Sequence, residues 1–153
     1  FSQHLKFNAA DRRRVAMAGL LHDIGKAKVP LAILEKPDRL NDEEMATMMQ
    51  HAALGHEALQ TVKGIHPEML DVVRHHHEYL DGSGYPDGLQ GGEISDLTRV
   101  VTIADNFGAL IERRAYKPQM SGHDAYQILL DMGGKLDRDL VRAFKTLSQA
   151  QFE

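Results

Sequence analysis

Apolar side chains recur every three or four residues along most of this chain, and the strict alternation typical of a half-buried strand is scarce. Residues 11–24 show the pattern clearly, with Val15, Ala18 and His22 on one face of a helix. A chain with this periodicity buries one stripe of each helix against its neighbours. We therefore predict an all-α fold, a single compact helical bundle.

Local signals set the expected boundaries of the helices. Asn41 followed three residues later by Glu44 is typical of a capping box, and Pro67 suits the first turn of a helix that leads into a histidine run. Gly25 is expected to end the first helix. The segment 81–92 contains five glycines and one proline, which predicts a loop. Further helices are predicted over residues 41–59, 96–111, 123–132 and 138–149.

Charge and cysteine content exclude several classes of function. The formal net charge of −4 gives no overall basic field, which disfavours a binder of polymeric nucleic acid. The chain has no cysteine, so disulfides, thiol catalysis and thiolate metal sites are all excluded. Any metal ion must be bound through nitrogen and oxygen.

The chain also lacks obvious targeting signals. No apolar run approaches the roughly 18 residues that a membrane-spanning helix needs, and no signal-peptide pattern opens the sequence. We expect a cytoplasmic domain, residues 1–153, without a membrane segment. Its first residue is Phe1 rather than Met, which indicates part of a longer protein.

The segment 73–86, V-R-H-H-H-E-Y-L-D-G-S-G-Y-P, places three consecutive histidines before a glycine-rich turn. His77 falls near the apolar face of the preceding helix and His76 lies just beside it, whereas His75 is expected to point outward. Two imidazoles at the edge of a core are costly unless both lone pairs are used. A metal site explains them, and a solvated histidine cluster is the alternative.

Other metal-competent groups are scattered along the chain. His22 and Asp23 diverge by about 100° on a helix, so they either bridge two ions or bind one ion at a helix end where the backbone loosens. Taken singly, His22 and His51 could be satisfied core histidines, and Asp23 and Asp105 could be surface carboxylates. Taken together, four helices each deliver such groups, and a helical bundle gathers them inward.

Four motifs in order resemble the HD-GYP family: L-H-D-I-G-K at 21–26, H-x-x-x-G at 51–55, H-H-E-Y-L-D-G-S-G-Y-P-D-G-L at 76–89 and R-V-V-T-I-A-D-N-F at 99–107. These are bacterial phosphodiesterases of the HD superfamily of metal-dependent phosphohydrolases, typically acting on cyclic di-GMP. The resemblance covers nearly the whole chain and implies a helical bundle of the HD-domain type.

The resemblance also implies a ligand set and a substrate site. It implies a binuclear metal centre of iron or manganese, although zinc, nickel or cobalt also suit imidazole and carboxylate. Asp23 is expected to bridge the two ions, and His22, Asp23 and Lys26 are expected to be catalytic. The implied metal ligands are His22, Asp23, His51, His76, His77 and Asp105. The implied substrate contacts are Lys26, Gly82, Gly84, Tyr85, Pro86, Arg114 and Lys117.

The chain departs from the family at its start. Family members carry an upstream helix with a further metal-binding histidine, and here that segment would precede Phe1. His4 lies too close to His22 in sequence to replace it and is expected at the surface. We therefore expect a domain that lacks its N-terminal helix and belongs to a longer signalling protein, with a sensory or receiver domain elsewhere.

The expected activity is hydrolysis of cyclic di-GMP to the linear dinucleotide, to GMP or to both, through a hydroxide that bridges the two ions. One alternative is a catalytically weak or inactive signalling module that binds a cyclic dinucleotide or a diguanylate cyclase partner. A phosphohydrolase for mononucleotides is a third, less favoured hypothesis, because the turn at 82–86 indicates a larger ligand.

Overall fold

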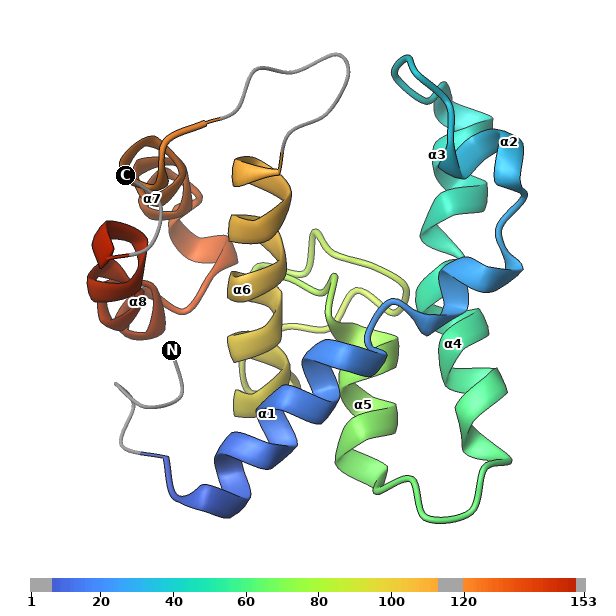
Figure 1. Ribbon diagram of the computed structural model, residues 1–153, viewed down its shortest axis with the longest axis horizontal. Coiled ribbons are helices and arrows are strands. Elements are labelled where there is room, and N and C mark those ends of the chain that lie inside the picture. Colours follow the sequence, from blue (N-terminus) through green and yellow to red (C-terminus); the bar gives the residue numbers. More distant parts are fainter. Residues whose placement is uncertain (1–6, 113–119, 151–153) are drawn as a thin grey trace.

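The computed structural model describes residues 7–112 and 120–150, and this part of the chain is helical without a β-strand, as predicted (Figure 1). No helix in these two segments is both long and apolar enough to cross a membrane. The α-helices are α1 (Ala9–Leu21), α2 (Leu31–Leu34), α3 (Asp42–Met49), α4 (His51–Gln60), α5 (Pro67–His75), α6 (Asp96–Ile111), α7 (Gly122–Asp131) and α8 (Arg138–Ala150), and the 3₁₀ helices are η1 (Ile24–Lys28), η2 (Gly91–Glu93) and η3 (Gly133–Lys135).

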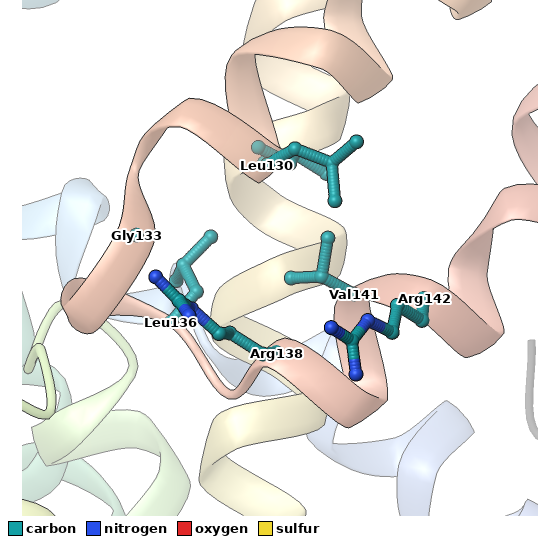
Figure 2. Close-up of a pocket in the computed structure, with 7 residues that line it drawn as sticks. Leu130, Gly133, Leu136, Arg138, Val141 and Arg142 are labelled. Carbon is teal, nitrogen blue, oxygen red and sulfur yellow. The ribbon is translucent and has the colours of Figure 1, made fainter.

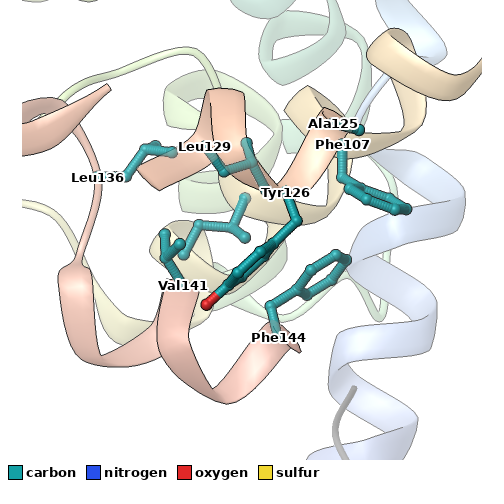
Figure 3. Close-up of a cluster of buried hydrophobic side chains, with 8 residues drawn as sticks. Phe107, Ala125, Tyr126, Leu129, Leu136, Val141 and Phe144 are labelled. Atoms are coloured by element: carbon teal, nitrogen blue, oxygen red, sulfur yellow. The ribbon is translucent and has the colours of Figure 1, made fainter. Parts of the chain in front are cut away.

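Helix α6 lies at the centre of the bundle (Figure 1). Helices α7 and α8 pack against one side of α6, and α1 and α5 pack against the other. Helix α4 lies beyond α5 and also packs on η1. Two buried clusters follow from this order: Ala18, Met69, Val72 and Val101 between α1, α5 and α6, and Ile103, Phe107, Ala125, Tyr126, Leu129, Leu136, Val141 and Phe144 between α6, α7 and α8 (Figure 3).

The predicted helix starts are present. Asn41 and Glu44 form a reciprocal capping box at the start of α3, with N···O distances of 2.9 and 2.8 Å. Pro67 occupies the first turn of α5, where its missing N–H costs no hydrogen bond. These signals are local, so they act in the isolated sequence as they do in the fold.

Two helix ends differ from the prediction. The single helix expected over 41–59 is divided, because the N–H of Gln50 bonds to the carbonyl of Thr47 at 3.2 Å and tightens the chain before α4 begins. The first helix ends at Leu21, three residues earlier than expected from the periodicity. His51 therefore opens a helix, and His22 closes one.

Gly25 does not terminate α1 but lies buried inside η1. A Cβ on this residue would overlap the carbonyl oxygen of His51 and crowd the backbone N of Gly55. The glycine is therefore required by the close approach of η1 to α4 rather than by a left-handed helix cap. This contact brings the segment after His22 against the start of α4.

Candidate metal centre

The six side chains expected to bind metal converge from four α-helices and η1. Most of them stand at helix ends, where adjacent side chains need not diverge as they do within a helix. His22 caps the C-terminus of α1, Asp23 precedes η1, His51 begins α4, and His76 caps α5, directly followed by His77. Asp105 alone lies within a helix, α6. His22 and Asp23 therefore stand at the end of α1 rather than within it.

One set of donors, the first donor group, consists of Asp23, His51, His76 and His77, whose candidate ligand atoms all lie within 4.8 Å of one another. The Nε2 atoms of His51 and His76 are 3.2 Å apart. Asp23 Oδ1 lies 3.4 Å from His51 Nε2 and 3.8 Å from His76 Nε2. Three imidazoles and a carboxylate around one point are a typical ligand set for a divalent transition metal.

The second donor group consists of His22, Asp23 and Asp105, again within 4.8 Å of one another. His22 Nε2 lies 3.4 Å from Asp23 Oδ2 and 3.5 Å from Asp105 Oδ1. Asp23 therefore belongs to both groups, with Oδ1 near His51 and Oδ2 near His22. A carboxylate whose two oxygens face different donor sets can link two cations.

The histidine rings are oriented by nearby helix ends: His22 by α1, His76 by α5, and His51, which opens α4, by the end of α3. Nδ1 lies 2.7 Å from the Gly19 carbonyl in His22, 2.8 Å from the Met48 carbonyl in His51 and 3.0 Å from the Val73 carbonyl in His76. A carbonyl only accepts, so each Nδ1 donates a proton. His51 and His76 are thus held in the tautomer whose Nε2 lone pair faces the cluster, which is the form that a metal ion requires.

Two buried atoms show that the donors fit a cation. His22 Nε2 and Asp23 Oδ1 are buried and make no hydrogen bond with any residue of 7–112 or 120–150. Buried polar atoms normally have partners, because leaving one unpaired costs about 1–3 kcal/mol. A divalent ion accepts lone pairs from both kinds of atom, so the residues present fit such a group.

The protonation states favour the same conclusion. Burial lowers the pKa of His76 to about 3 and that of His77 to about 4, and it also lowers the pKa of His51. Burial alone would raise the pKa of Asp23, but the nearby cationic groups of His22 and Lys26 outweigh burial and hold this pKa well below its usual range. At neutral pH the first donor group therefore presents neutral imidazoles and a carboxylate, which are the forms that bind metal.

His22 differs from the other imidazoles. Burial opposes its charge, but the carboxylates of Asp105 and Asp23 outweigh burial and raise the pKa of His22 to about 10. The protonated His22 ring thus lies as a cation between the carboxylates of Asp23 and Asp105. This electrostatic environment attracts positive charge, and a metal ion there would displace the proton from Nε2.

Lys26 lies in η1, where its Nζ is 2.6 Å from Asp23 Oδ2. Its side chain is 41% exposed, so the ammonium stands at the solvent side of the cluster. A cleft of about 750 Å³ opens at this point between α1 and α6. The polar residues that line it are His22, Asp23, Lys26, Asp105 and Glu112, and the others are Val15, Gly19, Val100, Val101, Ala104, Gly108, Ala109 and Ile111.

The glycine-rich turn packs on the cluster. The ring of Tyr85 stacks on that of His77 with centroids 4.7 Å apart and planes 23° apart, and the Tyr85–Pro86 peptide bond is cis. A Cβ on Gly84 would overlap the backbone of His77 and Glu78, and one on Gly82, which has φ +79°, would meet the Gln90 side chain. The close approach at these glycines is to the protein itself, and the expected nucleotide contacts stay a prediction.

The remaining predictions concern Arg114, Lys117, His4 and His75. Arg114, Lys117 and His4 lie outside the described residues. His75 belongs to neither donor group, but it does not point out into solvent: Nδ1 lies 2.8 Å from Asp71 Oδ1 and Nε2 lies 2.9 Å from Asp87 Oδ2. The third histidine of the run is therefore a link between two carboxylates.

Two buried residues beside the cluster have no counterpart in the sequence-based prediction. Glu78 is 2% exposed, and its carboxylate accepts hydrogen bonds from the loop that follows. Thr102 on α6 donates its hydroxyl to the carbonyl of His76 at 2.9 Å. The apolar stripe of α6 includes Thr102, but only the tertiary contact shows what its hydroxyl does.

A second, smaller cavity lies between α7 and α8 and shares no residue with the donor groups. Its volume is about 160 Å³. Figure 2 shows apolar side chains in it, among them Leu130, Leu136 and Val141, with Arg138 and Arg142 at the rim.

Comparison with known proteins identifies the family of the chain. The family model described as HD domain matches residues 1–140, and the chain belongs to this family. A solved structure of an HDGYP protein from Bdellovibrio bacteriovorus, Bd1817, superimposes with a TM-score of 0.76 over 95% of this chain and 47% of that one, at 22% identity. That likeness establishes the fold, and the HD-type helical bundle predicted from the motifs is confirmed.

Relatives that the chain matches are named as phosphodiesterases of cyclic dinucleotides. The chain is 38% identical over 132 residues to cyclic di-GMP phosphodiesterase PA4108 of Pseudomonas aeruginosa, covering 86% of this chain and 32% of the relative. It is 35% identical over 154 residues to 3'3'-cGAMP-specific phosphodiesterase 1 of Vibrio cholerae, covering 99% and 36%. It is 38% identical over 137 residues to the cyclic di-GMP phosphodiesterase response regulator RpfG of Xanthomonas campestris, covering 88% and 36%. The chain thus spans about a third of each relative.

Proposed function

We propose that this domain is a metal-dependent phosphodiesterase that hydrolyses a cyclic dinucleotide, cyclic di-GMP first among them, to the linear dinucleotide, to GMP or to both. The observation that carries the proposal is Asp23, whose two oxygens face two separate donor sets. The names of the relatives support the substrate class.

In this proposal the first donor group would hold one divalent ion and the second would hold another, with Asp23 shared between them. Bound ions would supply Lewis-acid stabilisation of the phosphoryl group and would lower the pKa of water at the site. Iron and manganese are our first candidates, and zinc, nickel and cobalt suit the same donors. The carbonyls of Gly19, Met48 and Val73 bind the Nδ1 atoms of His22, His51 and His76, so the Nε2 atoms are the ones that would bind either ion.

Lys26 and Tyr85 are the proposed substrate contacts within the described residues. The Lys26 side chain is 41% exposed and its ammonium adjoins the Asp23 carboxylate, so it can turn to a nonbridging phosphate oxygen. There it would stabilise the negative charge that develops in the transition state. The half-buried Tyr85 would offer its ring or its hydroxyl to a nucleotide beside His77.

The test is a substrate panel with protein purified anaerobically and analysed for metals. We expect hydrolysis of cyclic di-GMP with about two ions per chain, and we expect His76→Ala to lose both metal and activity. Asp131→Asn, an exposed change on α7, is the matched control. Full metal loading with tight binding of the dinucleotide but no cleavage of any phosphodiester would instead support the signalling-module hypothesis.

A mixed cyclic dinucleotide is the second candidate substrate, because one of the relatives described above is named a 3'3'-cGAMP-specific phosphodiesterase. The same panel separates the two by comparing kcat/KM for cyclic di-GMP and 3'3'-cGAMP. A preference for mononucleotides would exclude both. The sensory or receiver domain and the diguanylate cyclase partner stay predictions about a longer protein.

A further inference from the structure

Glu78 is a buried acid that plays no part in either donor group. It directly follows His76 and His77 in sequence and is 2% exposed. Burying a carboxylate is costly unless hydrogen bonds satisfy its oxygens. The partners of Glu78 therefore indicate why the residue is there.

Those partners are three consecutive backbone N–H groups. Oε1 accepts from Asp87 N at 2.6 Å and from Gly88 N at 3.0 Å, and Oε2 accepts from Leu89 N at 3.1 Å. Gly88 has φ +67°, the left-handed conformation that lets successive N–H groups point to one side. The turn thus forms an anion-binding nest, and the anion it binds is the side chain of Glu78.

The same loop is attached to His77 at its other end. Tyr85 N donates to the His77 carbonyl at 3.2 Å, and Gly84 packs against the backbone of residues 77 and 78. The Tyr85 ring then stacks on the His77 ring. Two neighbouring residues, His77 and Glu78, therefore hold both ends of the segment 84–89.

A further attachment of the loop, through Asp87, is nearer the solvent. Asp87 accepts two hydrogen bonds from Arg74, at 2.7 and 2.8 Å, and one from His75 at 2.9 Å. These side chains are partly exposed, so water competes for the contacts. The Glu78 carboxylate, by contrast, is buried, so water cannot take its place.

We propose that Glu78 is a positioning residue that fixes the turn 84–89 so that the Tyr85 ring lies against His77, beside the metal centre. Its effect on turnover rests on the proposed function, because it acts through the way Tyr85 meets a nucleotide. Its effect on the position of Tyr85 does not depend on any activity. The two effects are measured separately.

The structural effect is measured by ¹⁹F NMR of protein labelled with 3-fluorotyrosine. The chain has four tyrosines, and Tyr85→Phe identifies the Tyr85 line. In Glu78→Gln we expect this line to move towards the position of free fluorotyrosine while the lines of the buried Tyr126 and the half-buried Tyr79 stay in place. The exposed control Glu57→Gln should leave all lines unchanged. An unmoved Tyr85 line in Glu78→Gln overturns the proposal.

If Glu78→Gln fails to fold, all of the ¹⁹F lines move to the position of free fluorotyrosine. Gly88→Ala is then the variant that tests the proposal. Alanine is strained at φ +67°, so this change displaces the N–H groups of the nest while the carboxylate remains. Movement of the Tyr85 line alone supports the proposal, and an unchanged line overturns it.

The functional effect is measured with cyclic di-GMP and metal-loaded protein. For Glu78→Gln we expect unchanged metal content and a KM raised roughly tenfold, the scale of loss when a binding group is misplaced by a fraction of an ångström. A purely structural role would lower the melting temperature and leave KM unchanged well below it. An unchanged KM in a variant whose Tyr85 line has moved overturns the proposed effect of Glu78 on turnover. If wild-type protein hydrolyses no cyclic dinucleotide, the proposed function fails and the NMR result still stands.

Discussion

Asp23 lies where the two donor sets meet, and its two oxygens are not equivalent. Oδ1 is buried without a hydrogen bond in the described part of the chain, and Oδ2 is 2.6 Å from Lys26. An asparagine at this position keeps the shape but removes the charge and one acceptor. Asp23 is therefore the residue at which a shared site can be distinguished from two independent ones.

We predict that Asp23→Asn lowers the metal content from about two ions per chain to about one or fewer, because both donor groups lose an anionic ligand. Elemental analysis of anaerobically purified protein measures this directly. Asp131→Asn should retain the wild-type content. Two tightly bound ions in Asp23→Asn would show that the carboxylate is not shared.

Lys26 contacts Asp23 but is expected to act on the substrate. We predict that Lys26→Met retains the metal content and lowers kcat about 100-fold, the usual loss when one group that stabilises transition-state charge is removed. Metal analysis and steady-state kinetics on the same sample separate the two effects. A loss of metal equal to that in Asp23→Asn would make Lys26 a support for the carboxylate alone.

At the scale of helices, the starts and most of the ends were predictable, but the end of the first helix and the break before His51 were not. Asn41, Glu44 and Pro67 act within one turn, so their signals are legible in the sequence. The end of α1 at Leu21 depends on η1 docking against α4, and no pattern within residues 11–24 encodes that contact. The convergence of six donors followed from the motifs, whereas the roles of Glu78 and Thr102 required the tertiary contacts.

The docking of η1 on α4 depends on Gly25. We predict that Gly25→Ala destabilises the fold by at least about 2 kcal/mol, because the atoms that its Cβ meets belong to the backbone and cannot rotate away. Gly19→Ala is the control: a Cβ there meets no atom within 4 Å, and alanine favours the helix. Urea denaturation of both variants tests this, and equal midpoints would contradict it.

Asp71 connects α5 to the start of α6 and, through His75, to the turn. It accepts from Ser95 Oγ at 2.7 Å and Thr98 Oγ1 at 3.0 Å, and it lies 2.8 Å from His75 Nδ1. The bond to His75, with those to Ser95 and Thr98, lowers the pKa of Asp71 below its usual 3.8. The ionised form is thus held more tightly in the folded protein than in the unfolded chain.

The direction of the pH effect follows from that shift. The contribution of Asp71 is complete above the unfolded pKa and is lost as the pH falls through the lower folded pKa. We predict that Asp71→Asn costs about 1 kcal/mol at neutral pH. The difference from wild type should shrink on acidification below about pH 4. Denaturation curves at several pH values test this, and a difference independent of pH would rule out the carboxylate as its source.

For the whole molecule, metal binding and folding are coupled, because the donors come from segments far apart in sequence. We predict that Mn²⁺ at 100 times its dissociation constant stabilises the chelator-treated protein by about 2.7 kcal/mol. For a chain of this size the melting temperature should rise by about 5–10 °C. Differential scanning fluorimetry measures the shift. Asp23→Asn should show little of it, and an equal rise in that variant would place the ion elsewhere.

The tethering of His22, His51 and His76 to carbonyl groups of the preceding turn has a mechanical consequence. The rings of His22 and His76 are hydrogen-bonded to the helices that they cap, α1 and α5, so each ring is expected to follow its helix. A displacement of one helix along another would therefore change the distances between the donor atoms and leave each donor chemically unchanged. If the domain is the phosphodiesterase proposed above, a force applied at the far end of α1 would change the spacing of the donor atoms, and with it the activity, without replacing any donor residue.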